Sequence, residues 1–421
     1  MAVWTLAQAL RDSAVPTDQL DARYRPVIAI VRELIGVVPN CNPYLEIWPP
    51  AFRTFNVLIP NLLNLPAVLM GQGAPKDLVG LAMYVSSRET GCRYCTAHHC
   101  SFALRRGARL EAILDEDYDD VEGAVADLAT GLAQVPATLT SDTVELLHKH
   151  LDERDVEWVL LAVAMSGFLT KLMDTLGIEL EHETINDVEP LIGDRGWIPG
   201  KHQWLDELPP LPPTEGIPVD DFATILRVMR RAPGAVRLGS RWTKGVSGRV
   251  APALMMLEEH IGYAFPVLSG LRSRKAVKAV AAALRASLDP ATTNVGFGVK
   301  CMVAVVYAET VGDELLRSEA VLLASLLAPD VDPQLLAEVS QYARAGVGQD
   351  RVPAGLSTTE AAALQLARAA APSPVEVNEI TISTAVAGLS AEQIVEIVSW
   401  MAVLQMLHRL YVFQDARLGL L

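Results

Sequence analysis

The sequence contains few aromatic residues, although it is rich in apolar ones. Phe, Trp and Tyr make up 6% of the 421 residues, whereas 51% are hydrophobic, mostly Ala, Leu and Val. This composition favours packed helices over sheets, and we expect an all-α fold. At ~100–200 residues per domain, the length suggests two or three domains.

Long uninterrupted apolar runs are also lacking. A transmembrane helix needs ~20 consecutive apolar residues. The longest candidate, Trp158 to Leu169, is followed closely by Lys171. The first basic residue is Arg11, and no small-residue cleavage site follows an apolar run, so we expect no signal peptide. The chain is therefore predicted to be cytoplasmic and to have no membrane partner.

Positive charge is scarce, because the formal net charge is −15. Such an acidic chain is a poor match for a polyanion, and no nucleic-acid-binding module is recognisable, so no nucleic-acid partner is expected. A local exception is the run from Arg227 to Arg249, which holds seven positive residues and no acid. We interpret it as a solvated or subunit-contacting edge of a linker.

Cysteines are few and odd in number, which disfavours a secreted disulfide framework. Three of the five lie between Cys92 and Cys100, whereas Cys41 and Cys301 are isolated and are expected in the core. The pattern fits a reduced compartment with one reactive site. G-x-S-x-G, P-loop and dinucleotide-binding motifs are absent, which leaves hydrolase and nucleotide functions without support.

Helical periodicity organises most of the chain. The expected helices lie at 2–10, 24–35, 76–88, 90–106, 124–132, 141–150 and 152–176, with short helices between the prolines of 39–66. Periodicity is lost over 181–220, where Leu208 to Pro218 reads as a stiff extended linker. We predict a site-bearing domain at 1–185, a Pro-rich and basic linker at 186–245 and a further domain at 246–421.

The last of these domains resembles the first. The capping box Ser390-x-x-Gln393 opens a segment, IVEIVSWMAVLQMLHRL, that parallels DVEWVLLAVAMSGFLTKLM. An alignment of Gly312 with Gly91 sets Asp313, Leu316 and Ala320 against Cys92, Cys95 and His99. We therefore expect a degenerate repeat without the cysteine pair, and His408 is expected to be structural.

The chemistry concentrates in ETGCRYCTAHHCSFALRRG, from Glu89 to Gly107. On a helix, Cys92, Cys95 and His99 fall at i, i+3 and i+7 and share one stripe. A helix N-terminus favours a thiolate at Cys92, whereas the histidine one turn on favours one at Cys95. A C-x-x-C pair can close into a reversible disulfide, so the segment predicts a dithiol redox centre.

Other interpretations of these residues are weaker. A zinc site would add His98 or Cys100, but ligands on one continuous helix do not close a tetrahedron easily, so no metal is expected. Cys100 lies ~140° from Cys95 around the helix and is expected to be buried. His98 either faces the pocket or is an ordinary surface histidine. The acidic run Asp115 to Asp120 lacks the glycine and terminal glutamate of a calcium loop.

The segment CRYCTAHH resembles the AhpD-like (alkylhydroperoxidase) and carboxymuconolactone decarboxylase superfamily, whose signature is C-x-x-C-x-x-x-H. The GCRYC form resembles its peroxidase-related branch, and the resemblance covers roughly Pro43 to Glu181. It implies an all-helical, AhpD-like fold and a homo-oligomer, a dimer or trimer. It also implies that Cys95 attacks a hydroperoxide, that Cys92 resolves the sulfenic acid and that His99 belongs to a proton relay.

One position departs from the family pattern. The relay glutamate normally stands twelve residues before the first cysteine, where this chain has Gly80. Asp77 or Glu89 could replace it. The candidate catalytic residues are therefore Cys95, Cys92, His99, Glu89 and His98.

The predicted function is thiol-dependent reduction of a small-molecule hydroperoxide without a cofactor. A dithiol reductant, a lipoyl or thioredoxin-type protein, would then reduce the Cys92–Cys95 disulfide. The second half would act as a scaffold that supplies subunit contacts. Two alternatives remain: a lyase on a small carboxylated lactone, as in the decarboxylase branch, and a non-enzymatic redox-sensing or scaffold protein.

Overall fold

The computed structural model describes residues 4–204, 211, 216–345 and 351–420, and all regular structure in these residues is helical, as expected. The α-helices of the first half are α1 (Leu6–Ala9), α2 (Thr17–Ile35), α3 (Asn42–Leu45), α4 (Pro49–Leu62), α5 (Lys76–Glu89), α6 (Arg93–Arg105), α7 (Leu110–Leu114), α8 (Asp120–Ala133), α9 (Ser141–His150), α10 (Glu153–Leu176) and α11 (His182–Ile192). Those that follow are α12 (Phe222–Trp242), α13 (Val250–Ile261), α14 (Arg274–Ser287), α15 (Gly296–Val311), α16 (Glu314–Leu327), α17 (Pro333–Arg344), α18 (Thr358–Ala370), α19 (Glu379–Gly388) and α20 (Ala391–Arg417).

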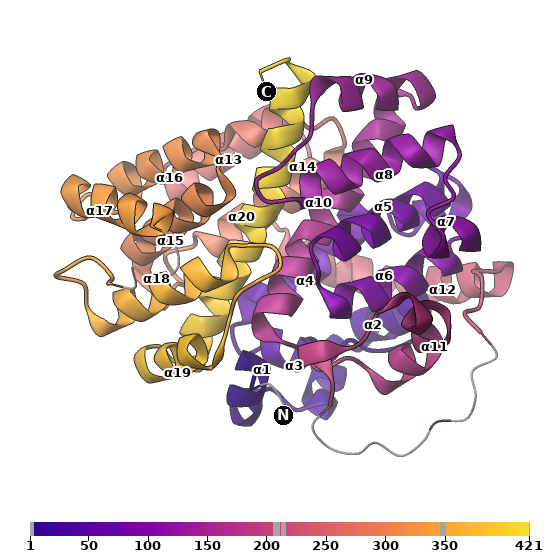
Figure 1. Ribbon diagram of the computed structural model, residues 1–421, viewed down its shortest axis with the longest axis horizontal. Helices are drawn as coiled ribbons and strands as arrows, with labels where there is room; N and C mark the ends of the chain where they lie inside the picture. Colours follow the sequence, from indigo (N-terminus) through magenta and orange to yellow (C-terminus); the bar gives the residue numbers. More distant parts are fainter. Residues whose placement is uncertain (1–3, 205–210, 212–215, 346–350, 421) are drawn as a thin grey trace.

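The two longest helices, α10 and α20, form the centre of the molecule. They pack along each other, with most helices of the first half and α12 on one side and α15–α19 on the other (Figure 1). Among the described residues, α10 alone is long and apolar enough to cross a membrane, and 94% of its most apolar 18-residue window is buried inside the fold. Oδ1 of Asp152 accepts the amides of Arg154 and Asp155, so Asp152 is the N-cap and α10 begins one residue after the predicted start at 152.

Helices α5 and α6 form a tight hairpin that carries the cysteine motif. Thr90 ends α5, and Gly91 turns the chain with a φ of +73°, a conformation that favours glycine. Near the far end of the hairpin, Gly80 lets the two backbones approach closely. A Cβ atom at this position would lie 2.6 Å from the Cα of Ala103. Position 80 therefore lies level with Ala103, away from the cysteines at the start of α6.

The second half repeats this hairpin. Helix α15 ends at Gly312, which also has a φ of +73°, and α16 follows. Asp313 caps α16 by accepting from the amide of Leu316 at 2.9 Å, just as the Cys92 sulfur accepts from the amide of Cys95. The proposed alignment therefore places residues with the same backbone role together. His408 lies on α20 with its Nδ1 2.8 Å from Asp313.

Two expectations for 181–245 need correction. The stretch 181–220 was predicted to lack helical periodicity, but α11 covers 182–192, where Thr184, Val188 and Ile192 are buried at helical spacing. The basic run is mostly helix α12, which packs on α2, and is therefore not the edge of a linker, although its seven basic residues are exposed as the solvated interpretation required. Most of the Pro-rich segment Leu208 to Pro218 lies outside the described residues. The division of the chain into domains stays a prediction.

Candidate functional site

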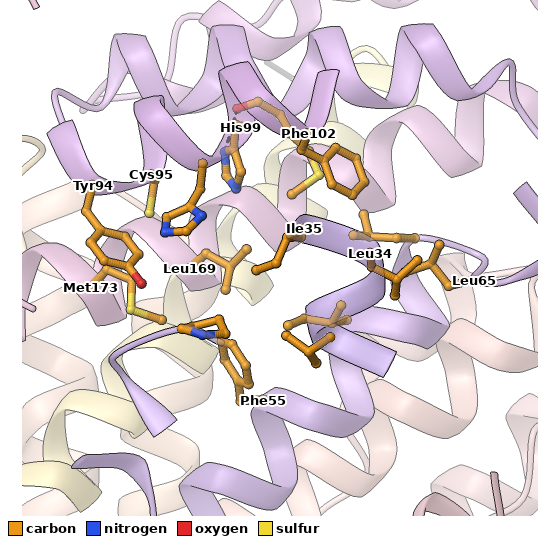
Figure 2. A pocket seen from close by; sticks show the side chains of 16 residues that line it. Leu34, Ile35, Phe55, Leu65, Tyr94, Cys95, His99, Phe102, Leu169 and Met173 are labelled. Carbon is orange, nitrogen blue, oxygen red and sulfur yellow. Dashed lines mark hydrogen bonds between the residues drawn. The ribbon is translucent and has the colours of Figure 1, made fainter. Parts of the chain in front are cut away.

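A cavity of about 90 Å³ lies beside the cysteine motif, enclosed mainly by α2, α4, α6 and α10. Its lining is largely aliphatic and aromatic, with few polar groups. Cys95 and His99 point into it from α6, opposite Phe55 and Leu169 (Figure 2). The whole lining comprises Val31, Leu34, Ile35, Pro39, Phe55, Ile59, Leu63, Leu65, Met83, Tyr94, Cys95, His98, His99, Phe102, Leu169 and Met173.

Cys92 lies behind this cavity and does not line it. It is the N-cap of α6, fully buried, and its Sγ accepts the amide of Cys95 at 3.3 Å. Burial alone would raise the pKa of this thiol, but hydrogen bonds from Cys95 and His202, with the charge of His202, lower its pKa to about 6. Cys92 is therefore the thiolate of the pair at neutral pH.

His202 and Asp174 complete the surroundings of Cys92. Nε2 of His202 lies 3.3 Å from Oδ1 of Asp174, and its Nδ1 donates to the carbonyl of Ile178 at 2.7 Å. Burial opposes protonation of His202, yet the hydrogen bonds to Asp174 and Cys92 raise its pKa to about 9. Lys201 lies 2.9 Å from Asp174 and helps to hold the pKa of that buried carboxyl below its usual value.

Cys92, Asp174 and His202 lie close enough together to be considered as a metal site. The ligand atoms of Cys92, Asp174 and His202 lie within 4.8 Å of one another. However, the Lys201 ammonium contacts the same carboxylate oxygen as His202 does. A cation already occupies that position, so we interpret the cluster as a hydrogen-bonded acid–base group.

Cys95 is the sulfur that a ligand in the cavity can reach. It is 2% exposed, and burial together with the neighbouring Cys92 thiolate raises its pKa well above the usual value. None of the five cysteines forms a disulfide in this structure. The structure thus gives the two cysteines different properties: Cys95 has access to the cavity, and Cys92 carries the negative charge.

His99 is a neutral imidazole. Its Nδ1 lies 3.0 Å from the carbonyl oxygen of Met83, which can only accept, so this nitrogen carries the proton. Burial lowers the pKa of His99 to about 3. Its Nε2 is therefore left as a proton acceptor on a residue that lines the cavity.

His98 also lines the cavity. Of the two positions considered from the sequence, pocket-facing or surface, the structure shows the first. Its Nε2 lies 2.6 Å from Oε2 of Glu181, whose other oxygen accepts the hydroxyl of Tyr94 at 2.8 Å. Glu181 is buried, which opposes ionisation, but His98 and the amide of Asn40 lower its pKa. Glu181 therefore remains ionised beside the cavity.

Glu89 is not brought to the cysteine pair. It forms an ion pair with Arg88 at 3.1 Å, and Arg88 also binds Glu116. Asp77 lies at the start of α5, at the end of the hairpin remote from Cys92. Neither candidate lines the cavity, so the carboxylates near the site are Asp174 and Glu181.

The sequence pattern did not indicate Asp174, Glu181 and His202. They come from the end of α10 and from segments after it, about eighty residues or more from the motif. The only available signal was the cluster of polar residues at the end of the long apolar helix, since a buried carboxylate there needs a partner.

No family model and no curated protein matches the chain. Solved structures similar to it include the apo debrominase Bmp8, with 19% identity over 41% of this chain and 92% of that chain, at a TM-score of 0.36. A cysteine-to-alanine variant of Bmp8 bound to 2,3,4-tribromopyrrole shows 18% identity over 42% and 95% of the two chains, at a TM-score of 0.38.

Proposed function

We propose that this protein is a thiol-dependent peroxidase that reduces an organic hydroperoxide at Cys95 and stores the oxidation as a Cys92–Cys95 disulfide. The observation that carries the proposal is the division of roles between the two sulfurs. Cys95 faces an apolar cavity, and Cys92 lies at the N-cap of the same helix beside the protonated His202. The resemblance of CRYCTAHH to the AhpD-like superfamily supports the same assignment.

The first step oxidises Cys95. The Cys92 thiolate takes the proton of the Cys95 thiol, to which it is hydrogen bonded. The Cys95 sulfur then attacks the terminal oxygen of the hydroperoxide, and the O–O bond breaks. The proton that left Cys95 passes to the departing alkoxide, which leaves as the alcohol. Sulfur has lost two electrons, the peroxide has gained them, and Cys95 is a sulfenic acid.

The second step forms the disulfide. The Cys92 thiolate attacks the sulfur of the Cys95 sulfenic acid, the S–S bond forms and the S–O bond breaks. The departing hydroxide takes a proton from the His202 imidazolium and leaves as water. An external dithiol, such as a lipoyl or thioredoxin-type protein, then reduces the disulfide and returns both protons.

The lyase alternative has less support from the cavity. A carboxylated lactone would need a cationic side chain facing it, and the described residues that line this cavity include no Lys or Arg. A thiol reaction on an uncharged group fits the lining better.

The test is hydroperoxide consumption in the presence of a dithiol reductant. The parent protein should turn over, and Cys95→Ser and Cys92→Ser should each lose more than ~100-fold in rate. Cys100→Ser is the matched control, because Cys100 is buried away from the cavity and should retain parental activity. Equal rates in the parent and both active-site variants would refute the peroxidase proposal.

A further inference from the structure

A second cavity of about 390 Å³ lies against the first. It is enclosed by α2, α4, α12 and α14 and is larger than the cavity at Cys95. The two cavities share four lining side chains, Val31, Leu34, Ile59 and Leu65. These aliphatic side chains form a thin partition between the second cavity, called the outer cavity below, and the cavity that the Cys95 thiol lines.

The outer cavity is lined mainly by apolar side chains, and two lysines also line it. Val228, Ala232 and Ala235 of α12 form one wall of the outer cavity. Trp242, the last residue of α12, also lines it. Lys275 and Lys278 enter from α14 at i and i+3, which places both ammonium groups on one face. The described residues that line the cavity include no Asp or Glu.

The two lysines differ in their availability. Nζ of Lys275 donates to the side-chain oxygen of Asn64 at 2.9 Å, and its partial burial lowers its pKa. Lys278 is half-buried and has no hydrogen-bond or ion-pair partner within the described part of the chain. A half-buried cation without a counter-ion favours an anionic ligand group.

We propose that the outer cavity is a substrate-binding vestibule for an apolar hydroperoxide that carries a carboxylate, as a fatty-acid hydroperoxide does. The carboxylate binds Lys278 and Lys275, and the apolar arm passes the aliphatic partition so that the peroxide reaches Cys95. This inference rests on the proposed peroxidase function for its chemistry. It also gives α12 and the second half a direct part in the site, beyond that of a scaffold.

The first test compares three substrates: a fatty-acid hydroperoxide, its methyl ester and tert-butyl hydroperoxide. For Lys278→Met, KM for the acid should rise roughly fivefold or more, with kcat and the constants for the other two unchanged. Lys149→Met, on the exposed face of α9, is the matched control and should change none of them. Equal effects of Lys278→Met on all three substrates would overturn the proposal.

The second test measures binding without catalysis, so that it does not depend on peroxidase activity. A saturated fatty acid of matching length should quench the fluorescence of Trp242, seen as the difference between the parent and Trp242→Phe. Lys278→Met should weaken binding of the acid roughly fivefold relative to the parent. The methyl ester should bind the parent and Lys278→Met with the same affinity. An absence of saturable quenching by the acid would refute the vestibule. Quenching with no hydroperoxide turnover would instead refute the peroxidase proposal alone.

Discussion

Nε2 of His202 lies 3.3 Å from Oδ1 of Asp174, and both groups lie beside the sulfur of Cys92. This relationship explains how a fully buried thiol can be ionised. Burial by itself favours the neutral thiol. Hydrogen bonds from Cys95 and His202, together with the charge of the His202 imidazolium that Asp174 keeps protonated, lower the pKa of Cys92 and reverse that preference.

Loss of the imidazolium should therefore raise the pKa of Cys92. In His202→Gln we expect it to move from about 6 to ~8.5 or above, because burial is then opposed only by the hydrogen bonds of Cys95. The ultraviolet absorbance of the thiolate as a function of pH, taken as the difference between each protein and the same protein carrying Cys92→Ser, gives this value without a reagent that must reach the buried sulfur. His260→Gln, at a half-exposed position far along the chain, is the control. An unchanged profile in His202→Gln would contradict the assigned role.

The same pair makes stability depend on pH. The folded-state pKa of Cys92, about 6, is below its unfolded value of ~8.5, so its contribution is fully present above ~8.5 and is lost as pH falls through 6. The folded-state pKa of His202, about 9, is above its unfolded value of ~6.5, so its contribution is fully present below ~6.5 and is lost as pH rises through 9. The Tm difference between the parent and His202→Gln should be largest between pH ~6.5 and ~8.5. A difference that rises steadily from pH 5 to 10 would contradict the ion pair.

Gly80 is explained by packing. Gly80→Ala places a Cβ atom 2.6 Å from the backbone of Ala103 and should lower the free energy of unfolding by ~1–3 kcal/mol. Gly80→Glu should destabilise further and should not raise peroxide turnover, because position 80 is remote from Cys92. Gly123→Ala in α8 is the control, since its nearest neighbour is 3.9 Å away, and it should gain up to ~1 kcal/mol. Higher activity in Gly80→Glu would contradict this explanation. Denaturant unfolding and turnover assays measure both effects.

A buried arginine of the second half joins the two halves of the molecule. Nη1 of Arg409 donates to Ser86 and to the carbonyl of Val163, both at 2.6 Å. A Cβ atom on Gly167 would lie 2.7 Å from Nε of this arginine. Gly167→Ala should therefore cost ~1–3 kcal/mol in the parent and clearly less when combined with Arg409→Met, as urea unfolding of the four proteins would show. If Gly167→Ala lowers the free energy of unfolding equally in the parent and in Arg409→Met, the Arg409 side chain is not what an added Cβ atom at position 167 clashes with.

The sequence predicted the parts of the fold that depend on local pattern. Ser390 caps α20 as its capping box predicted, and α10 begins just after Asp152, where the helix over 152–176 was expected to start. The helix expected over 90–106 begins only at Arg93, because Gly91 turns the chain with a positive φ. Helix α11 was missed because only three of its residues are buried, which leaves a weak apolar pattern. The motif indicated Cys92, Cys95 and His99 because their spacing is itself helical. The partners of Cys92 could not be predicted, because the folded chain brings Asp174 and His202 to it from distant positions.

In the proposed reaction, peroxide oxidises Cys95 first and Cys92 then resolves the sulfenic acid. The most direct test of this order is mass spectrometry of protein treated with one equivalent of hydroperoxide and a sulfenic-acid trap. We expect a Cys92–Cys95 disulfide in the parent and a trapped sulfenic acid on Cys95 in Cys92→Ser. We expect no trapped adduct in Cys95→Ser. A sulfenic acid on Cys92 in Cys95→Ser, with Cys95 unmodified in Cys92→Ser, would contradict the account.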